Sequence, residues 1–444
     1  MKFTKINPPL PPGPLGLPII GNLPFIQPQL HRFFSDLSRI YGPIIKLRMG
    51  RMIVIVINSP SLANEVLKVQ DAIFANRDIP AAGVVGTFGG LNIAWRPKSP
   101  GYDRLRKLVV CEIMSKQSLD ACYVLRRHEV RRMVTEIHGK VGSLVNIDEQ
   151  LSATALRVMT STLWDLIELR KRLDEFIITF ATPNVSDLYP ILAPFDLQGI
   201  ESKAKEQLSW FYGVFESMIN NRRNIGDDGK EKEKISKDFM QQLLELHQRG
   251  DDNSSLSLNE VKALLLWTMT ELLRHPDKMT KLIEELNMVV GNQNTMEECY
   301  IPQLVYLDAV IKETLRLHPV APLLLPHVPS ETTIIGGYTI PKGCRLWDDP
   351  LRFQPERFLE TDINHWDNNF RYLPFGSGRR MCVGISMAKK MAALLVSSLV
   401  HSFEWRLPEG TKLSLEDKFG LVLKKRESLV AIPIARLPNL EQYK

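Results

Sequence analysis

The sequence predicts a mainly α-helical fold with a smaller β portion. Residues 102–246 carry apolar side chains at helical spacing, and prolines interrupt this stretch only near residues 183–194. Short β-branched runs occur in pairs on either side of glycines, as expected for hairpins. A further helical pattern covers residues 387–399, directly after a glycine-rich loop that contains a cysteine. At 444 residues and 44% hydrophobic composition, the chain can bury a core around a sizeable cofactor.

The first elements follow from local signals. Six prolines between residues 8 and 18 favour stiff, extended backbone, which fits either a linker or a rigid hinge. Residues 44–47 and 52–57 are β-branched runs on either side of Gly50, so they predict a hairpin. Ser59 is a good N-cap and Pro60 suits the first helical position, so a helix is expected from there to Lys68.

The later elements are marked by caps and turns. Residues 226–234 and 251–255 are polar and are expected to form loops. Ser257 and Glu260 form a capping box before a helix that should stop before Pro276. Residues 332–335 and 338–340 flank a Gly-Gly pair and predict a second hairpin. A last hairpin is expected over residues 421–432.

Composition excludes several classes of protein. Lys and Arg exceed Asp and Glu by 56 − 50 = 6, which suits an acidic partner or an anionic membrane surface but is too dilute to indicate nucleic-acid binding. No run of about 18 apolar residues occurs, so we expect no transmembrane helix and no N-terminal anchor. The odd number of scattered cysteines, without a CxxC pair, argues against structural zinc and secreted disulfides. These cysteines are Cys111, Cys122, Cys299, Cys344 and Cys382.

The strongest chemical signal is the segment FGSGRRMCVG, residues 375–384. Its glycines let the backbone turn tightly and approach a flat ligand. Arg379 and Arg380 place positive charge near Cys382, and the following helix adds the partial charge of its N-terminus. Both effects favour the thiolate, which is a good axial ligand for haem iron. A buried structural cysteine is the alternative, but the complete F-x-x-G-x-R-x-C-x-G pattern favours haem ligation.

The chain resembles the cytochromes P-450 of the plant microsomal type, which are haem-thiolate monooxygenases. The resemblance covers nearly the whole chain and includes PPGPLGLPIIGNL (residues 11–23), KETLRLHP (312–319) and FQPERF (353–358). It implies haem b as the cofactor, with Cys382 as the proximal iron ligand and Arg380 at a haem propionate. The other residues implied to surround the haem are Phe375, Gly378 and Gly384. Residues 1–25 would form a hinge without an anchor, and residues 26–444 the haem-binding catalytic domain.

Glu313 and Arg316 fit an E-x-x-R motif. Residues three apart on a helix are neighbours, and the pair lies opposite the apolar stripe of its helix. The residues alone therefore fit an ordinary exposed salt bridge, which would contribute about 0.2–0.5 kcal/mol. The resemblance implies instead that the pair and Arg357 form a buried ion network that supports the cysteine loop. We expect a structural role for all three.

Three apolar segments match loops that line the substrate pocket in the family. They predict contacts to an apolar terpenoid, flavonoid or other phenylpropanoid, although core packing explains the same composition equally well. A basic face for an acidic electron donor is a further prediction, with a solvated helix face as its alternative. The pocket residues are Thr87, Phe88, Val320, Leu323 and Leu421, and the basic residues are Arg104, Arg106, Lys107, Arg126, Arg127, Arg131 and Arg132.

The sequence departs from the family pattern in several places. The acid–threonine segment that delivers protons during oxygen activation is absent, and about four turns of the central helix are missing, so no catalytic residue is assigned. A segment after E-x-x-R, beyond Gly343, is also shorter, as is the stretch near residues 163–172. Tyr102 and Asp103 stand where a Trp-Arg pair is expected, and an acid there opposes a propionate by sign.

These observations predict a haem-dependent monooxygenase of secondary metabolism. It would insert one oxygen atom from O2 into an apolar plant metabolite, with electrons from NADPH through NADPH-cytochrome P-450 reductase. A haem-thiolate isomerase or dehydratase that does not activate O2 is the second hypothesis, and an inactive haem-binding or truncated chain is the third. The resemblance implies the cytoplasmic face of the endoplasmic reticulum, reached by peripheral membrane contact, and the missing anchor leaves a soluble cytoplasmic protein as the alternative.

Overall fold

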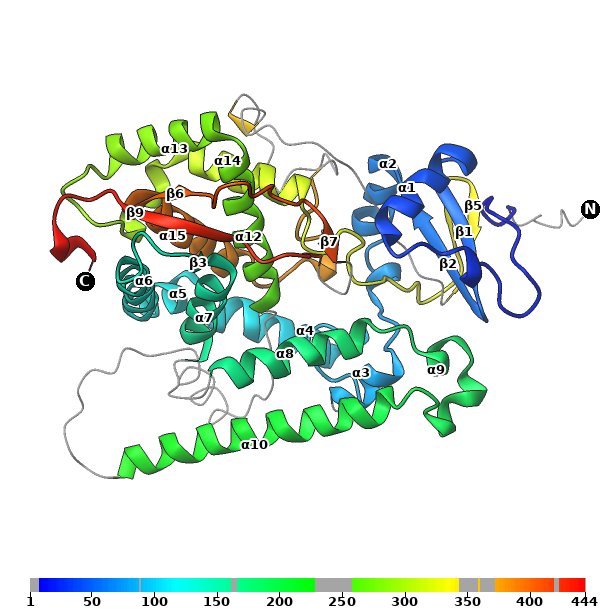
Figure 1. Ribbon diagram of the computed structural model, residues 1–444. Helices are drawn as coiled ribbons and strands as arrows, with labels where there is room; N and C mark the ends of the chain where they lie inside the picture. The colour runs from blue at the N-terminus through cyan, green and yellow to red at the C-terminus, as the bar shows by residue number, and fades with distance from the viewer. Residues whose placement is uncertain are drawn as a thin grey trace, which may run out of the picture.

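The computed structural model describes residues 8–87, 89–160, 166–227, 258–342, 358–359, 372–418 and 423–443. Two unequal parts are visible in Figure 1. A small sheet with its helices lies near the N-terminus, and a larger helical body extends from it to the C-terminus. The fold is mainly α-helical with a minor β portion, as predicted.

The small part is built on the first predicted hairpin. Strands β1 (Ile44–Met49) and β2 (Met52–Ile57) pair antiparallel, and the turn places Gly50 at a φ of 60°. Helix α1 (Leu30–Tyr41) packs on this sheet through Phe34, which is 1% exposed. Helix α2 (Pro60–Asn64) begins where predicted, with the Ser59 hydroxyl accepting a hydrogen bond from the Leu62 N–H, and a π-helical turn then continues to Val69.

The proline-rich segment lies against these strands. The Lys46 N–H donates to the Pro12 carbonyl at 2.8 Å, and the Thr339 N–H donates to the Pro9 carbonyl at 2.9 Å. Gly13 approaches so closely that a Cβ there would lie 2.0 Å from the Lys46 carbonyl oxygen. The prolines therefore hold the segment in an extended form that follows β1 and strand β5 (Tyr338–Ile340). The division into a hinge and a catalytic domain stays a prediction.

The helical body surrounds α15 (Ile385–Ser402), of which almost every residue is buried. A helix that is apolar on all sides belongs in the centre of a domain. Figure 1 shows α15 beside α12 (Leu258–Arg274), and α14 (Val305–Leu317) and α13 (Pro276–Val289) also contact it. On the opposite side α6 (Tyr123–His138) contacts α15, and α7 (Ile147–Thr160) contacts α12.

Three further helices lie at the edge of the body. Helix α3 (Ala81–Gly86) packs against both α8 (Leu166–Ala181) and α10 (Ile200–Asp227), and the last two also contact each other. Helix α9 (Val185–Leu188) separates α8 from α10 at the predicted proline-rich break. Helix α10 runs to Asp227, two residues into the expected polar loop; the remainder of that loop and residues 251–255 lie outside the described residues.

The last predicted hairpin is wrong. Strand β8 (Lys424–Lys425) pairs with β7 (Asp417–Lys418), whereas β9 (Val430–Ala435) pairs with β6 (Phe403–Arg406) and β3 (Val145–Asn146). β8 and β9 therefore lie in different sheets. Each strand pairs with a segment other than its neighbour, and local turn signals do not encode such pairings. The Gly-Gly hairpin, β4 (Thr333–Ile335) with β5, forms as predicted.

Candidate functional site

The cysteine loop is a sequence of tight turns that ends at the N-terminus of α15. Gly376 and Gly378 have φ angles of 68° and 65°, in the left-handed region that only glycine adopts easily. A Cβ at Gly378 would lie 2.0 Å from the Leu67 carbonyl oxygen, so the loop meets the turn after α2 without room for a side chain. These two glycines therefore fix the path of the loop.

Cys382 stands at the end of this loop. Its N–H donates to the Phe375 carbonyl at 3.0 Å, and its Sγ accepts from the Gly384 N–H at 3.4 Å. Gly384 is the N-cap of α15, so the sulfur lies beside the partially positive end of an 18-residue helix. The side chain is partly exposed. This setting stabilises a thiolate, and a thiolate is what a haem iron binds.

Arg380 crosses from the loop to the segments before α4 (Pro100–Leu108). Its guanidinium donates to the carbonyl oxygens of Ala75 at 2.5 Å, Arg96 at 2.5 Å and Ile93 at 3.4 Å. It also stacks 3.9 Å from the centre of the Tyr102 ring. Burial lowers the pKa of Arg380. The three carbonyl oxygens orient the Arg380 guanidinium, but being neutral they do not balance its positive charge.

Arg77 and His327 are buried beside Arg380, and sequence reasoning missed both. Arg77 donates to the carbonyls of Leu325 at 2.8 Å and Pro326 at 3.0 Å, while its Nε is buried and has no hydrogen-bond partner among the described residues. Burial first and the charge of Arg380 second lower the pKa of Arg77 to about 9. Burial and then the charge of Arg77 lower the pKa of His327 well below its usual value. The segments FANRDIP and LLPHVP carried no stronger signal than a basic residue in an apolar run.

This cluster tests whether the residues fit haem b. Two buried guanidiniums raise each other's electrostatic energy, and the orphaned Nε of Arg77 leaves one buried donor unmet. A carboxylate ligand would remove both costs. A thiolate on one side and buried cations on another are the donor set that an iron porphyrin with two propionates requires. The residues therefore fit the group.

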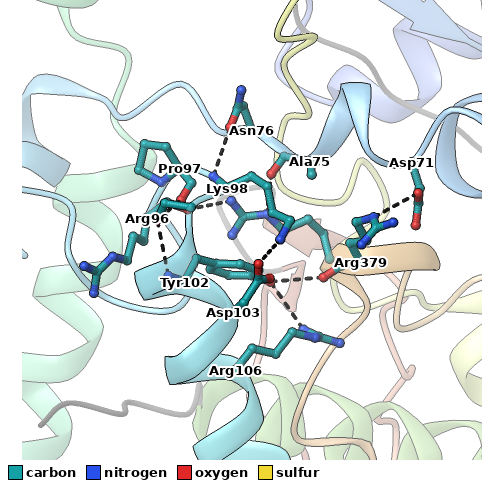
Figure 2. A network of polar contacts seen from close by, with 12 residues as sticks. Asp71, Ala75, Asn76, Arg96, Pro97, Lys98, Tyr102, Asp103, Arg106 and Arg379 are labelled. Atoms are coloured by element: carbon teal, nitrogen blue, oxygen red, sulfur yellow. Dashed lines mark hydrogen bonds and ion pairs between the residues drawn. The ribbon is translucent and has the colours of Figure 1, made fainter. Parts of the chain in front are cut away.

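Tyr102 and Asp103, on α4, do not oppose this arrangement. Figure 2 shows the Tyr102 hydroxyl directed at the Arg379 carbonyl, to which it donates at 3.0 Å. Asp103 is exposed and forms an ion pair with Lys98. Arg106 donates to the Tyr102 oxygen at 3.4 Å. Asp103, which was expected to oppose a haem propionate, is therefore paired with Lys98 at the surface instead.

Glu313 and Arg316 form a bidentate ion pair, with Nε–Oε2 and Nη2–Oε1 distances of 2.7 and 2.9 Å. Glu313 is fully buried and the Arg316 side chain is 16% exposed. The helix-face argument, which allowed an exposed pair, is wrong because α14 is covered on both sides. Arg357, the expected third member, lies outside the described residues.

Helix α12 carries a buried carboxylate that the sequence did not single out. Glu271 is fully buried and lies 2.6 Å from His318 Nε2 through Oε1; its Oε2 is 3.3 Å from both Arg274 and His275. The His318 ring stacks on Trp267, with centroids 4.0 Å apart. The Glu271 carboxylate thus ties α12 to the segment after α14, and it is not directed at the cysteine loop by any of these contacts.

The predicted pocket residues lie in different surroundings. Thr87 is 7% exposed at the C-terminus of α3, and its hydroxyl donates to the Gly83 carbonyl at 2.6 Å. Val320 packs in the main core, whereas Leu323 packs on the β1–β2 sheet. Phe88 and Leu421 lie outside the described residues. Val320 and Leu323 are thus in separate packing clusters.

The structure removes Arg126 from the basic face predicted for an electron donor, whereas the side chains of Arg127 and Arg132 are 50% and 53% exposed. Arg126 is fully buried and holds Glu298 through two contacts of 2.6 and 3.0 Å. Arg127 and Arg131 share Glu297, at 2.7 and 3.2 Å. Acidic residues from the segment after α13 thus pair with three arginines of α6, and these pairs join residues that are far apart in the sequence. Arg104 and Lys107 of α4 are exposed and remain available to a partner.

Comparison with known proteins agrees with the sequence and the site. The family model described as Cytochrome P450 matches residues 11–432. Carnosic acid synthase from Salvia pomifera is 35% identical, over 96% of this chain and 93% of the relative. Geraniol 8-hydroxylase from Catharanthus roseus is 32% identical, over 96% and 94%. A zebrafish cytochrome P450 solved with progesterone matches with a TM-score of 0.74 and 26% identity, over 91% of this chain and 99% of that one.

Proposed function

The chain belongs to the cytochrome P450 family, and from this premise we propose that it is a haem-dependent monooxygenase acting on an apolar plant terpenoid or phenylpropanoid. The proposal includes O2 as co-substrate and electrons from NADPH delivered by a cytochrome P-450 reductase. The single observation that carries it is Cys382 at the N-terminus of α15, two residues after Arg380, whose guanidinium is buried beside that of Arg77.

The bound haem b would supply the oxygen chemistry. Cys382 would hold the iron, while Arg380, Arg77 and His327 would bind the propionates and so orient the ring. The Glu313–Arg316 pair would keep α14 rigid behind the loop. Apolar groups on the substrate side would exclude water. The relatives act, by their names, on geraniol, geranylhydroquinone and related plant compounds, and a substrate of this class is proposed here.

A spectrum of the reduced, carbon-monoxide-bound protein tests the proposal. We expect a strongly red-shifted Soret band in the expressed chain and its loss in Cys382→Ala. Cys111→Ala, at an exposed position, is the matched control and should keep the band. Turnover of geraniol with NADPH, O2 and reductase follows. A soluble chain without any haem signal would refute haem-thiolate chemistry.

Haem-thiolate isomerase or dehydratase activity is the second candidate. The absent acid–threonine segment favours it, because such reactions need no proton delivery to O2. In the described part of α12, the Thr270 hydroxyl donates to the Leu266 carbonyl and Glu271 is paired with His318, so neither supplies the missing function. Conversion of a fatty-acid hydroperoxide without reductase or NADPH would support this candidate, and strict dependence on NADPH would exclude it.

Peripheral membrane contact at the endoplasmic reticulum is proposed for the location. In the parts of the chain that the structure describes, no helix is long and apolar enough to span a membrane. Large apolar side chains are exposed on two segments, residues 15–19 and 191–195. Hydrogen bonds show that these segments adjoin: the Arg51 N–H donates to the Leu188 carbonyl, and the Tyr189 hydroxyl donates to the Ile19 carbonyl at 3.5 Å. We call this surface the apolar edge; it comprises Leu15, Leu17, Ile19, Ile191 and Phe195.

A further inference from the structure

Helix α10 buries a polar residue in the middle of its packed face. Ala204, Gln207 and Phe211 follow each other at helical spacing and are 0%, 2% and 6% exposed. Ala204 packs against Ala82 of α3. Phe211 packs against Phe176 of α8, with ring centroids 5.3 Å apart. Gln207 lies between these two residues on the buried face of α10, the face that packs against α3 and α8. Figure 1 shows these three helices side by side.

Aromatic rings of α8 lie close to α3 at this junction. A Cβ at Gly86 of α3 would lie 2.8 Å from the Phe180 ring and 3.5 Å from the Phe176 ring. Thr87 follows at the end of α3, and its hydroxyl is already satisfied by the Gly83 carbonyl. Among the described residues, the side chains shown to pack along this junction are small or aromatic and carry no hydrogen-bonding group; they are Ala82, Ala204, Phe176, Phe180 and Phe211.

Both polar atoms of the Gln207 amide, Oε1 and Nε2, are buried and have no hydrogen-bond partner among the described residues. Within the described ranges no other side-chain amide has both atoms in this state. Such a group costs about 1–3 kcal/mol when nothing satisfies it, and buried polar groups are bonded in the great majority of cases. The partner of this amide therefore comes from a group other than the described side chains, and a bound ligand can supply it.

We propose that Gln207 is a specificity-determining residue that hydrogen-bonds the hydroxyl group of an otherwise apolar substrate. The proposal rests on the proposed function and names its substrate class as a terpenoid or phenolic alcohol. An amide presents an N–H donor and a carbonyl acceptor, and a hydroxyl can satisfy both. A hydrocarbon would leave both amide atoms without a hydrogen bond. A carboxylate cannot donate to Oε1, and its negative charge would be repelled by that oxygen.

Ligand titrations of the full-length chain test this. The probes are geraniol and myrcene, the terpene hydrocarbon with the same carbon skeleton. The readout is the fluorescence of Trp210, which lies one turn from Gln207 on α10, and Trp210→Phe identifies its share of the signal. We expect the wild-type chain to bind geraniol about tenfold more tightly than myrcene. Gln207→Met should abolish this preference by weakening geraniol alone.

Two controls separate recognition from folding. Gln117→Met, at an exposed position on α5 (Lys116–Ala121), should keep the geraniol preference. Because Gln207 makes no hydrogen bond to any residue that the structure describes, Gln207→Met should keep or raise the melting temperature, whereas a structural role would lower it. Gln207→Leu serves as a second variant if Met alters the packing. Unchanged geraniol preference in a folded variant, or no binding of either probe by the wild type, would overturn the proposal.

The titration is independent of turnover. If the carbon-monoxide spectrum shows no thiolate band but Trp210 still reports a geraniol preference that Gln207→Met removes, the proposed function fails and the recognition role of Gln207 stands. If the thiolate band is present and the geraniol preference is absent, the proposed function stands and the recognition role of Gln207 fails.

Discussion

At the residue scale, the site depends on backbone positions that tolerate a single amino acid. Gly378 combines a left-handed φ of 65° with a close approach to the Leu67 carbonyl oxygen. The sequence identified this glycine as part of the haem loop from the spacing of the motif alone. It could not show which backbone the glycine meets, since Leu67 is distant in sequence.

Gly378→Ala should therefore lower the stability of the chain and abolish haem retention. The added Cβ meets backbone that cannot yield without moving the turn after α2, so we expect a loss of about 3 kcal/mol or more. Gly337→Ala is the matched control, because its φ is 81° but nothing lies within 4 Å of the added Cβ. The control should cost only about 1 kcal/mol. Urea unfolding measures both, and equal losses would contradict the close-approach argument.

At the element scale, helices are joined by buried ion pairs. Glu313 and Arg316 stabilise α14, and Glu271 with His318 connects α12 to the segment that follows α14. A buried pair adds little over an apolar substitute, but removal of one partner leaves an unmet charge. The sequence periodicity correctly placed Glu313 and Arg316 off the apolar stripe of α14. It could not show their burial, because the neighbouring helices come from other parts of the chain.

Glu313→Gln should accordingly destabilise the chain by about 3–5 kcal/mol, because Arg316 would keep a largely buried charge without its carboxylate. Asp36→Asn removes an exposed pair with Arg39 at the same i,i+3 spacing, with side chains 63% and 78% exposed. That control should change the free energy of unfolding by less than about 0.5 kcal/mol. Chemical denaturation compares the two, and a small effect of Glu313→Gln would show that the pair is not structural.

At the scale of the whole molecule, two buried histidines make folding sensitive to acid. Burial lowers the pKa of His327 and of His401 in the folded chain. The unfolded chain then binds protons that the folded chain does not, below a pH of about 6.5. The stability is therefore complete above that pH and is lost as the pH falls from about 6.5 towards the folded pKa values.

The expected slope is up to about 1.4 kcal/mol per pH unit for each histidine. Urea unfolding between about pH 7.5 and about pH 5.5 should show the decline, and His401→Gln should make it shallower. His128, with a side chain 69% exposed, provides the control variant His128→Gln. A decline of the same steepness in His401→Gln would show that this residue does not contribute.

The apolar edge makes a second prediction for the whole molecule. Ile191 and Phe195 are 77% and 69% exposed, so Ile191→Ser with Phe195→Ser should reduce co-sedimentation with phosphatidylcholine vesicles several-fold. Met288→Ser on α13, where the side chain is 86% exposed, removes apolar surface far along the chain and should leave vesicle binding unchanged. Equal binding by all variants would remove the edge as the contact surface.

The sequence by itself determined the features that local spacing encodes. The cysteine loop, its glycines, the first hairpin, the Gly-Gly hairpin and the courses of α12 and α15 follow from turns, caps and periodicity, which act between near neighbours. The family and its cofactor follow from the same motifs. These features needed no knowledge of distant contacts.

Only the tertiary structure decided which separate segments meet. It brought Arg77 and His327 to Arg380, buried Arg126 against Glu298, and paired β9 with β6 and β3 instead of its neighbour in sequence. It also placed the unmet amide of Gln207 at the junction of three helices. Burial and charge pairing depend on groups far apart in the chain, and their free energy is defined only once the fold has set the distances.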